Sequence, residues 1–153
     1  MGNLYIVATP IGNLQDITMR AIKTLLAVDA IACEDTRRTG VLMHQIQALN
    51  TTNKPISQPR LISHYEQNEL QRIPEIINAL KNGLNIALVS NAGTPTISDP
   101  GFKLVRECIR EGIRVESIPG PSSVITALSA SGLPTDKFLF LGYPPRKPGH
   151  RKT

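Results

Sequence analysis

The sequence predicts an α/β fold in which a mostly parallel, five-stranded sheet carries helices on both faces. Two features indicate this fold. Short, continuous apolar runs of the kind found in strands buried on both faces alternate with segments of helical periodicity. The chain has 153 residues, 41% of them hydrophobic and 19% charged, which is enough for one domain with a core of its own.

Five apolar runs account for the sheet. The expected strands are residues 4–8 (LYIVA), 30–33 (AIAC), 61–63 (LIS), 86–89 (IALV) and 115–118 (VESI). Their brevity and their continuous apolar character favour a parallel sheet covered on both sides over a solvated hairpin sheet.

Helical periodicity fills the segments between these strands. Asp16 can cap a helix whose apolar positions run to Val28, and residues 41–49 favour a second helix. Pro74 suits the first turn of a third helix, or else kinks a longer one that begins near Asn68. Asp99 is the expected cap of a fourth helix, with Pro100 at its first position.

The C-terminal part of the sequence predicts a change of domain. Residues 122–131 form an expected helix of small and apolar residues, which we expect to be buried. Residues 138–141 (FLFL) are typical of a further strand, which would begin a second α/β domain. We therefore expect a first domain over residues 1–134, and a connection with the first strand of a truncated second domain over residues 135–153.

The formal charge of +5 is concentrated in the tail. The last ten residues contain Arg146, Lys147, Arg151 and Lys152 and no acid, and without them 13 basic residues face 12 acidic ones. This tail is either a surface for an anionic partner or a solvated linker, and charge alone favours neither.

Cysteine and histidine usage, together with hydropathy, bears on the location of the protein. Cys33 and Cys108 lie in apolar settings far apart in the sequence, which indicates buried thiols rather than a metal pair. The three histidines are scattered, so no metal site is expected. No apolar stretch approaches the roughly 20 residues of a membrane helix, and no basic run precedes the first apolar segment. We expect a cytoplasmic protein with no membrane contact.

Unusual loops follow all five strands. They are residues 9–13 (TPIGN), 34–38 (EDTRR), 64–66 (HYE), 90–101 (SNAGTPTISDPG) and 119–123 (PGPSS). Because the carboxyl ends of parallel strands share one edge of a sheet, these loops should meet there, where ligands bind in such folds. Gly12, Gly93 and Gly120 would let the backbone approach a ligand closely.

The acidic loop after the second strand has two interpretations. The carboxylates of Glu34 and Asp35 could accept a proton from a hydroxyl, and Arg37 could hold a phosphate. Alternatively, the two acids only stabilise a helix N-terminus, and Arg37 forms a structural ion pair. The spacing alone slightly favours this second interpretation. Neither a G-x-G-x-x-G nor a P-loop motif occurs.

Five separated motifs resemble the tetrapyrrole-methylase superfamily in their order and spacing. They are LYIVATPIGNLQDIT, ACEDTRRT, NAGTPTISDPG, IPGPSS and FLFLGYPPRK, and together they span the chain. Within this superfamily they are similar to the branch that methylates the 2′-hydroxyl of a cytidine in 16S rRNA. The resemblance implies a two-domain homodimer that binds S-adenosylmethionine between its domains and acts on the small ribosomal subunit.

The resemblance also assigns site residues. It implies proton acceptance by Glu34 or Asp35, and substrate binding by Arg37, Arg146 and Lys147. The cofactor would be held by Pro10, Gly12, Asn91, Ala92, Gly93, Thr94, Pro95, Ile97, Ser98, Pro119, Gly120, Pro121, Ser122 and Ser123. The superfamily usually reads D-A-G-T-P-G where this chain has Asn91 at the first position and Thr96 at the last.

Two other functions are compatible with the sequence. The chain could be a non-catalytic, truncated module that binds the cofactor or RNA, or a methylase of a small tetrapyrrole. The E-D-T-R segment and the basic tail favour RNA over a tetrapyrrole. If the chain does stop short of a second domain, we expect it to lack substantial methyl-transfer activity by itself.

Overall fold

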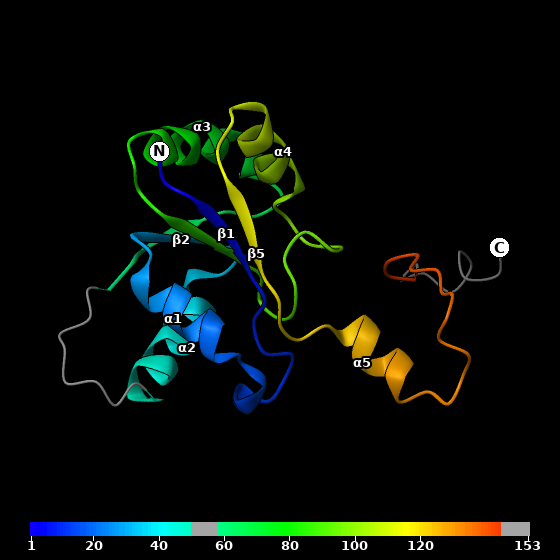
Figure 1. Ribbon diagram of the computed structural model, residues 1–153. Coiled ribbons are helices and arrows are strands. Elements are labelled where there is room, and N and C mark those ends of the chain that lie inside the picture. The colour runs from blue at the N-terminus through cyan, green and yellow to red at the C-terminus, as the bar shows by residue number, and fades with distance from the viewer. Residues whose placement is uncertain (50–57, 145–153) are drawn as a thin grey trace. The chain divides into compact units, whose positions relative to one another are not determined.

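A five-stranded parallel sheet forms the centre of the computed structural model, which describes residues 1–49 and 58–144 (Figure 1). The strand order is β3-β2-β4-β1-β5, and all four neighbouring pairs are parallel. The strands are β1 (Leu4–Val7), β2 (Ala30–Cys33), β3 (Arg60–Ser63), β4 (Ile86–Val89) and β5 (Val115–Ile118). The prediction of a parallel five-stranded sheet is confirmed.

Helices cover both faces of this sheet, as predicted. They are α1 (Met19–Ala27), α2 (Thr36–Leu49), α3 (Glu69–Lys81) and α4 (Phe102–Arg110), and a 3-10 turn η1 (Leu14–Asp16) precedes α1. In Figure 1, α1 and α2 lie on one face and α3 and α4 on the other. A hydrophobic core lies on each face of the sheet, and alternate residues of each strand pack into one core or the other. Leu4 and Ile6 pack with α3 and α4, whereas Val7 packs with α1 and α2.

The starts of three helices correct the sequence prediction. The cap of α1 is Thr18, whose hydroxyl accepts from the Ala21 N–H at 3.0 Å, and Asp16 instead ends the 3-10 turn. Helix α2 begins at Thr36 rather than near residue 41. Helix α4 begins after Gly101, whose φ of 119° is incompatible with a helix, so Asp99 lies in the preceding turn and is not a cap.

Helix α3 follows the longer of the two predicted alternatives. It begins at Glu69, directly after Asn68, and Pro74 lies in its interior. The ring of Pro74 removes one intrahelical hydrogen bond, and packing of Ile76, Ile77 and Leu80 in the core compensates. The prediction of buried thiols is also confirmed, because Cys33 and Cys108 are both buried.

The chain divides into two compact units, Met1–Ser122 and Ser123–Thr153. In the second unit, α5 (Ser123–Ser129) confirms a helix, but none of its residues is buried, so the expected burial is wrong. Residues 138–141 also form no strand, which corrects that prediction. A strand requires a hydrogen-bonded neighbour, and no described segment of this unit is a strand; the four side chains are 43% to 83% exposed.

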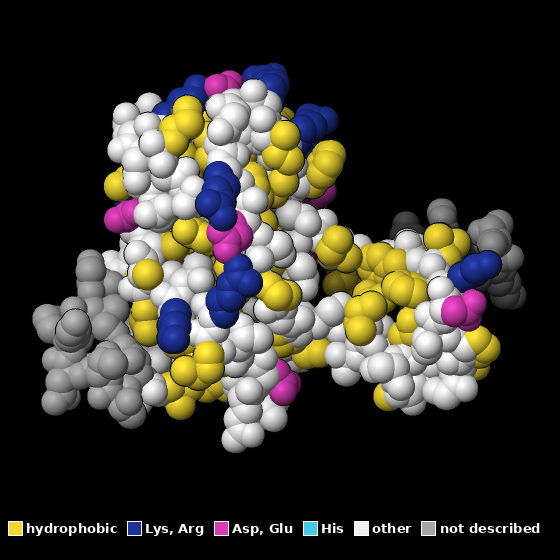
Figure 2. Space-filling view, viewed as in Figure 1, with side chains coloured by type: hydrophobic (Ala, Val, Ile, Leu, Met, Phe, Trp, Pro, Cys, Tyr) yellow, Lys and Arg dark blue, Asp and Glu magenta, His cyan; other side chains and the backbone are white. Residues whose placement is uncertain are grey.

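The edge strand β5 is protected by charge. Figure 2 shows basic and acidic side chains following one another over this part of the surface. Glu116, in the middle of β5, pairs with Arg20 of α1 and, at 3.3 Å, with Arg114. Charged side chains along an exposed strand discourage pairing with another chain. In the described part of the chain, no helix is long and apolar enough to cross a membrane.

A buried carboxylate ties α3 to the start of α4. The Glu69 side chain is 5% exposed; its Oε1 accepts from the Gly101 N–H at 3.0 Å, and its Oε2 lies 3.1 Å from Lys103 Nζ. Glu69 thereby satisfies an N–H near the beginning of α4 that has no partner inside the helix. The contact also holds the C-terminal end of the long loop that follows β4.

We expect Glu69→Ala to lower the free energy of unfolding by about 1–3 kcal/mol, because the Gly101 N–H would be left buried without a partner. Glu69→Gln should cost less, since the amide oxygen can still accept that hydrogen bond. Urea denaturation measures both, with the exposed Glu66→Ala as the control. Equal stability of Glu69→Ala and Glu66→Ala would contradict the assigned contact.

Candidate functional site

Three loops are joined at the carboxyl edge of the sheet. Thr9, after β1, and Gly93, after β4, exchange two backbone hydrogen bonds of 2.9 and 3.0 Å. The Thr94 hydroxyl donates to the carbonyl of Pro121, after β5, at 3.2 Å. The loops that the sequence places after these strands therefore converge on one edge, as parallel strands require.

The backbone is closely packed at two glycines of this edge. A Cβ on Gly93 would lie 3.4 Å from Ile11 Cγ2 and 3.9 Å from the Pro121 oxygen, and Gly93 has a φ of 84°. A Cβ on Gly120 would lie 3.0 Å from the Cβ of Ala8. Both positions favour glycine, and they leave backbone rather than side chain facing the loops around them.

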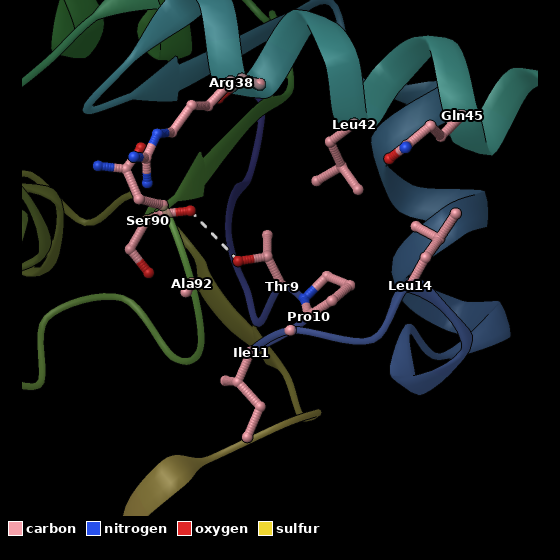
Figure 3. Close-up of a pocket in the computed structure, with 12 residues that line it drawn as sticks. Thr9, Pro10, Ile11, Leu14, Arg38, Leu42, Gln45, Ser90 and Ala92 are labelled. Carbon is pink, nitrogen blue, oxygen red and sulfur yellow. Dashed lines mark hydrogen bonds between the residues drawn. The ribbon is translucent and has the colours of Figure 1, made fainter.

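A cavity of about 380 Å³ opens between the β1 loop and α2 (Figure 3). Its lining residues are Thr9, Pro10, Ile11, Gly12, Leu14, Arg38, Thr39, Leu42, Gln45, Ser90, Asn91 and Ala92. Four residues predicted to bind the cofactor line this cavity: Pro10, Gly12, Asn91 and Ala92. The predicted residues from Gly93 to Ser122 do not line it, and Ser123 belongs to the second unit.

The contribution of α2 to this cavity was not predicted from the sequence. Arg38, Leu42 and Gln45 have i, i+4, i+7 spacing and so share one face of the helix. This spacing can be seen in the sequence. Because the helix was expected to begin near residue 41, however, Arg38 was assigned to the loop before it. The predicted start of α2 was wrong because Asp35 caps the helix and brings it forward to Thr36.

Glu34 is held beside the cavity by Asn91, whose Nδ2 donates to Glu34 Oε2 at 2.8 Å. Burial raises the pKa of the Glu34 carboxyl. The negative charges of Asp99 and Asp35 raise it further, and the Arg38 guanidinium lowers it.

Burial also raises the pKa of Asp99, whereas a hydrogen bond with Ser90 lowers it by a smaller amount. Two neighbouring carboxyls therefore hold protons more readily than usual. Asp99, interpreted from the sequence as a helix cap, instead places a negative charge near Glu34.

Asp35 has the opposite environment. Its Oδ1 accepts from the Arg37 N–H at 2.9 Å, which caps α2, and its Oδ2 lies 3.4 Å from Arg37 Nη2. Hydrogen bonds from the side chain and backbone of Arg37 lower the pKa of Asp35. For these two residues the structure matches the helix-cap and ion-pair interpretation of the motif. The Arg37 side chain is otherwise 91% exposed.

The loop between β4 and α4 contains backbone strain. Thr96 and Ser98 have φ values of 75° and 55°, in the left-handed region that glycine favours. The Thr9–Gly93 bridge holds this loop at one end and the Glu69–Gly101 hydrogen bond at the other. Such strain persists where surrounding contacts determine the backbone, which is common at ligand-binding sites.

Two predicted site residues, Arg146 and Lys147, lie outside the residues that the structure describes, so their role in substrate binding stays a prediction. Across residues 1–49 and 58–144, no group of three or more His, Cys, Asp and Glu side chains could hold a metal ion.

The parallel sheet and the Gly- and Pro-rich loops at its carboxyl edge define a protein class. The family of tetrapyrrole (corrin/porphyrin) methylases matches residues 3–150, and the chain belongs to this family. The uroporphyrin-III-C-methyltransferase of Thermus thermophilus superposes on 88% of this chain and 53% of its own, with a TM-score of 0.60 and 25% identity. A second crystal structure of that enzyme, complexed with S-adenyl homocysteine, has a TM-score of 0.58 at 21% identity and supports the fold alone.

Curated relatives lie closer in sequence. The chain is 51% identical over 152 residues to the ribosomal RNA small subunit methyltransferase I of Thermotoga maritima, covering 99% of this chain and 64% of that protein. It is also 51% identical to the protein of the same name from Escherichia coli O157:H7, covering 99% of this chain and 50% of that protein. The chain thus spans about half to two thirds of the length of these relatives.

We expect Thr96→Gly to raise the free energy of unfolding by up to about 1 kcal/mol. A side chain in the left-handed region costs roughly 1–2 kcal/mol, part of which the greater freedom of glycine in the unfolded chain offsets. Thr96→Ala keeps the Cβ and should gain less. Chemical denaturation of the two variants tests this, and Thr96→Gly proving no more stable than Thr96→Ala would contradict strain at this residue.

Asn91→Asp should destabilise the protein in a pH-dependent way. A carboxylate 2.8 Å from Glu34 would raise the pKa of this pair in the folded state above its unfolded value. The folded protein then binds more protons, so stability present at low pH is lost as the pH rises through the folded pKa. The loss relative to wild type should be larger at about pH 7 than at about pH 5.

Thermal melting at both pH values measures this difference. Asn91→Ala is the control, since it removes the hydrogen bond to Glu34 but adds no charge. A destabilisation by Asn91→Asp that does not change with pH would show that the two side chains do not interact.

Proposed function

We propose that this protein methylates the 2′-hydroxyl of a cytidine in 16S rRNA of the small ribosomal subunit, using S-adenosylmethionine. The main support is 51% identity, over almost the whole chain, to proteins named ribosomal RNA small subunit methyltransferase I in two distant bacteria. The acid–base environment of Glu34 is compatible with that chemistry.

The loops on the Gly93 side of the carboxyl edge fit the cofactor. Because Gly93 and Gly120 lack side chains, these loops pack closely against Ile11 and Ala8, which fixes their backbone at this edge. The cofactor would be held by Gly93, Thr94, Pro95, Ile97 and Ser98 from one loop and by Pro119, Gly120, Pro121 and Ser122 from the other. When bound, S-adenosylmethionine supplies a methyl group already activated by its sulfonium.

In this proposal Glu34 accepts the proton of the ribose hydroxyl. Its raised pKa brings the carboxylate closer to the basicity needed near neutral pH, and the Asn91 amide fixes its orientation. Asp35 is less suited, because its Oδ1 caps α2 and its pKa is lowered. Positioning the hydroxyl contributes much of the rate, since alignment of reactants lowers a barrier by several kcal/mol.

RNA would be held through its phosphates. Arg37 is exposed at the start of α2, and Arg146 and Lys147 add positive charge in the tail, so binding should weaken as salt rises. We further propose that residues 1–134 are one domain, that residues 135–153 lead into a second domain, and that the protein is a cytoplasmic homodimer. The shorter span of this chain relative to its relatives is compatible with such a second domain.

Transfer of labelled methyl groups to small ribosomal subunits that lack the modification tests the proposed function. Two proteins are compared: this chain, and this chain joined to the C-terminal part of the Thermotoga maritima relative. We expect substantial transfer only with the joined protein. Glu34→Gln in that protein should lower kcat about a hundredfold, whereas the exposed Glu66→Gln should not.

Absence of transfer by both proteins would overturn the proposed function. If both bind the cofactor without turnover, the non-catalytic module is favoured; transfer to a tetrapyrrole instead of rRNA would favour the third function. Equal turnover by the two proteins would show that the chain is active without the added part.

A further inference from the structure

The lining of the cavity beside α2 contains none of the residues from Gly93 to Ser122 to which we assign the cofactor. It does contain four residues that the resemblance also assigns to the cofactor, namely Pro10, Gly12, Asn91 and Ala92. All its lining residues lie within residues 9–14, 38–45 and 90–92, and none comes from the loop after β5. The Thr9–Gly93 bridge lies at this boundary, because Thr9 lines the cavity and Gly93 packs toward Pro121. The cavity therefore has room for a second ligand beside the cofactor.

The walls of the cavity combine apolar surface with two polar groups of different kinds. Pro10, Ile11, Leu14 and Leu42 supply the apolar surface. In Figure 3, Leu42 and Gln45 point from α2 toward the β1 loop, and Leu14 points toward α2 from below. Arg38 extends from the same helix at the end of the cavity where Ser90 lies.

Arg38 is an available cation. No described carboxylate forms an ion pair with it, whereas the neighbouring Arg37 is paired with Asp35. The Arg38 charge acts on Glu34, but it has no ion-pair partner among the described carboxylates. A guanidinium of this kind at the mouth of a cavity favours an anionic group, and its planar fork suits a phosphate. Gln45 offers a donor and an acceptor together, which suits the hydrogen-bonding edge of a base.

We propose, on the basis of the proposed function, that this cavity receives the target nucleotide as a pyrimidine extruded from the RNA. The base lies against the surface formed by Leu14 and Leu42, and Gln45 hydrogen-bonds to its edge. Arg38 binds the adjoining phosphate. The ribose then lies over residues 90–92, next to Asn91, which holds Glu34.

Size and depth support this occupant. Cavities that enclose small ligands start at about 300 Å³, so this one suits a single nucleotide better than a stacked segment. Ser90 and Thr9 are 6% and 2% exposed, so the inner wall lies at the buried strand ends. A base that remained stacked in an RNA helix would not reach this wall, and enzymes that act on a nucleotide commonly extrude it.

The test uses the chain itself and nuclear magnetic resonance of its backbone amides. Cytidine 5′-monophosphate, cytidine and adenosine 5′-monophosphate are titrated separately to about 10 mM, a range that detects millimolar Kd values. Shifts caused by the cytidine monophosphate should cluster on the residues that line the cavity. Adenosine monophosphate should bind more weakly, because the proposed hydrogen bonds of Gln45 are made to the edge of a pyrimidine.

Two variants with matched controls separate the contacts. Arg38→Ala should weaken binding of cytidine monophosphate about tenfold but leave cytidine unchanged, and Arg110→Ala, on the opposite face of the sheet, should change neither. Gln45→Ala should weaken both ligands about fivefold, and Gln47→Ala, outside the cavity lining, should weaken neither.

Each outcome decides the proposal. Shifts elsewhere, no shifts, or equal effects of Arg38→Ala and Arg110→Ala would overturn it. Displacement of cytidine monophosphate by S-adenosylhomocysteine would assign the cavity to the cofactor and also overturn it. If cytidine monophosphate does not bind in the cavity but methyl transfer to ribosomal subunits is observed, the proposed function still holds. The binding test and the transfer test can therefore fail independently.

Discussion

The site depends on a pair of backbone hydrogen bonds between two neighbouring strand ends. Just beyond β1 and β4, which are neighbours in the sheet, the N–H of Thr9 donates to the Gly93 carbonyl and the N–H of Gly93 donates to the Thr9 carbonyl. The Thr9 hydroxyl also donates to the Ser90 carbonyl at 3.2 Å. Because these groups are buried and mutually satisfied, the loops leave the sheet in fixed directions. One side of this bridge is the cavity, and the other is the glycine-rich backbone around Gly93 and Pro121.

Electrostatic roles at this edge follow from environment rather than residue type. Glu34 and Asp35 are adjacent in the sequence, yet burial and neighbouring acids raise the pKa of one carboxyl, while capping of α2 and Arg37 lower that of the other. Arg37 and Arg38 differ in the same way, since one pairs with Asp35 and the other lines the cavity. Successive residues of a helix that begins at Thr36 differ in direction by about 100°, so Arg37 faces solvent and Arg38 faces the cavity.

In the loop between β4 and α4, tertiary contacts override the local conformational preferences of the residues. The loop from Asn91 to Gly101 places a β-branched Thr96 in the left-handed region. In place of a helix cap at Asp99, the Gly101 N–H donates a hydrogen bond to the distant Glu69. Both departures concern the segment that joins β4 to α4. Local preference and global structure conflict here, as is common at binding sites, where the fold maintains a backbone that the sequence alone would not select.

The sequence by itself determined the parallel sheet, its five strands, the helices on both faces and the set of loops at the carboxyl edge. Buried strands and amphipathic helices leave patterns of period two and period 3.6, which can be seen without knowing their partners. Only the tertiary structure decided the strand order, the start of α2, the Arg38–Gln45 wall and the exposure of α5 and residues 138–141. These features depend on which groups distant in sequence come into contact, and a local pattern does not contain that information.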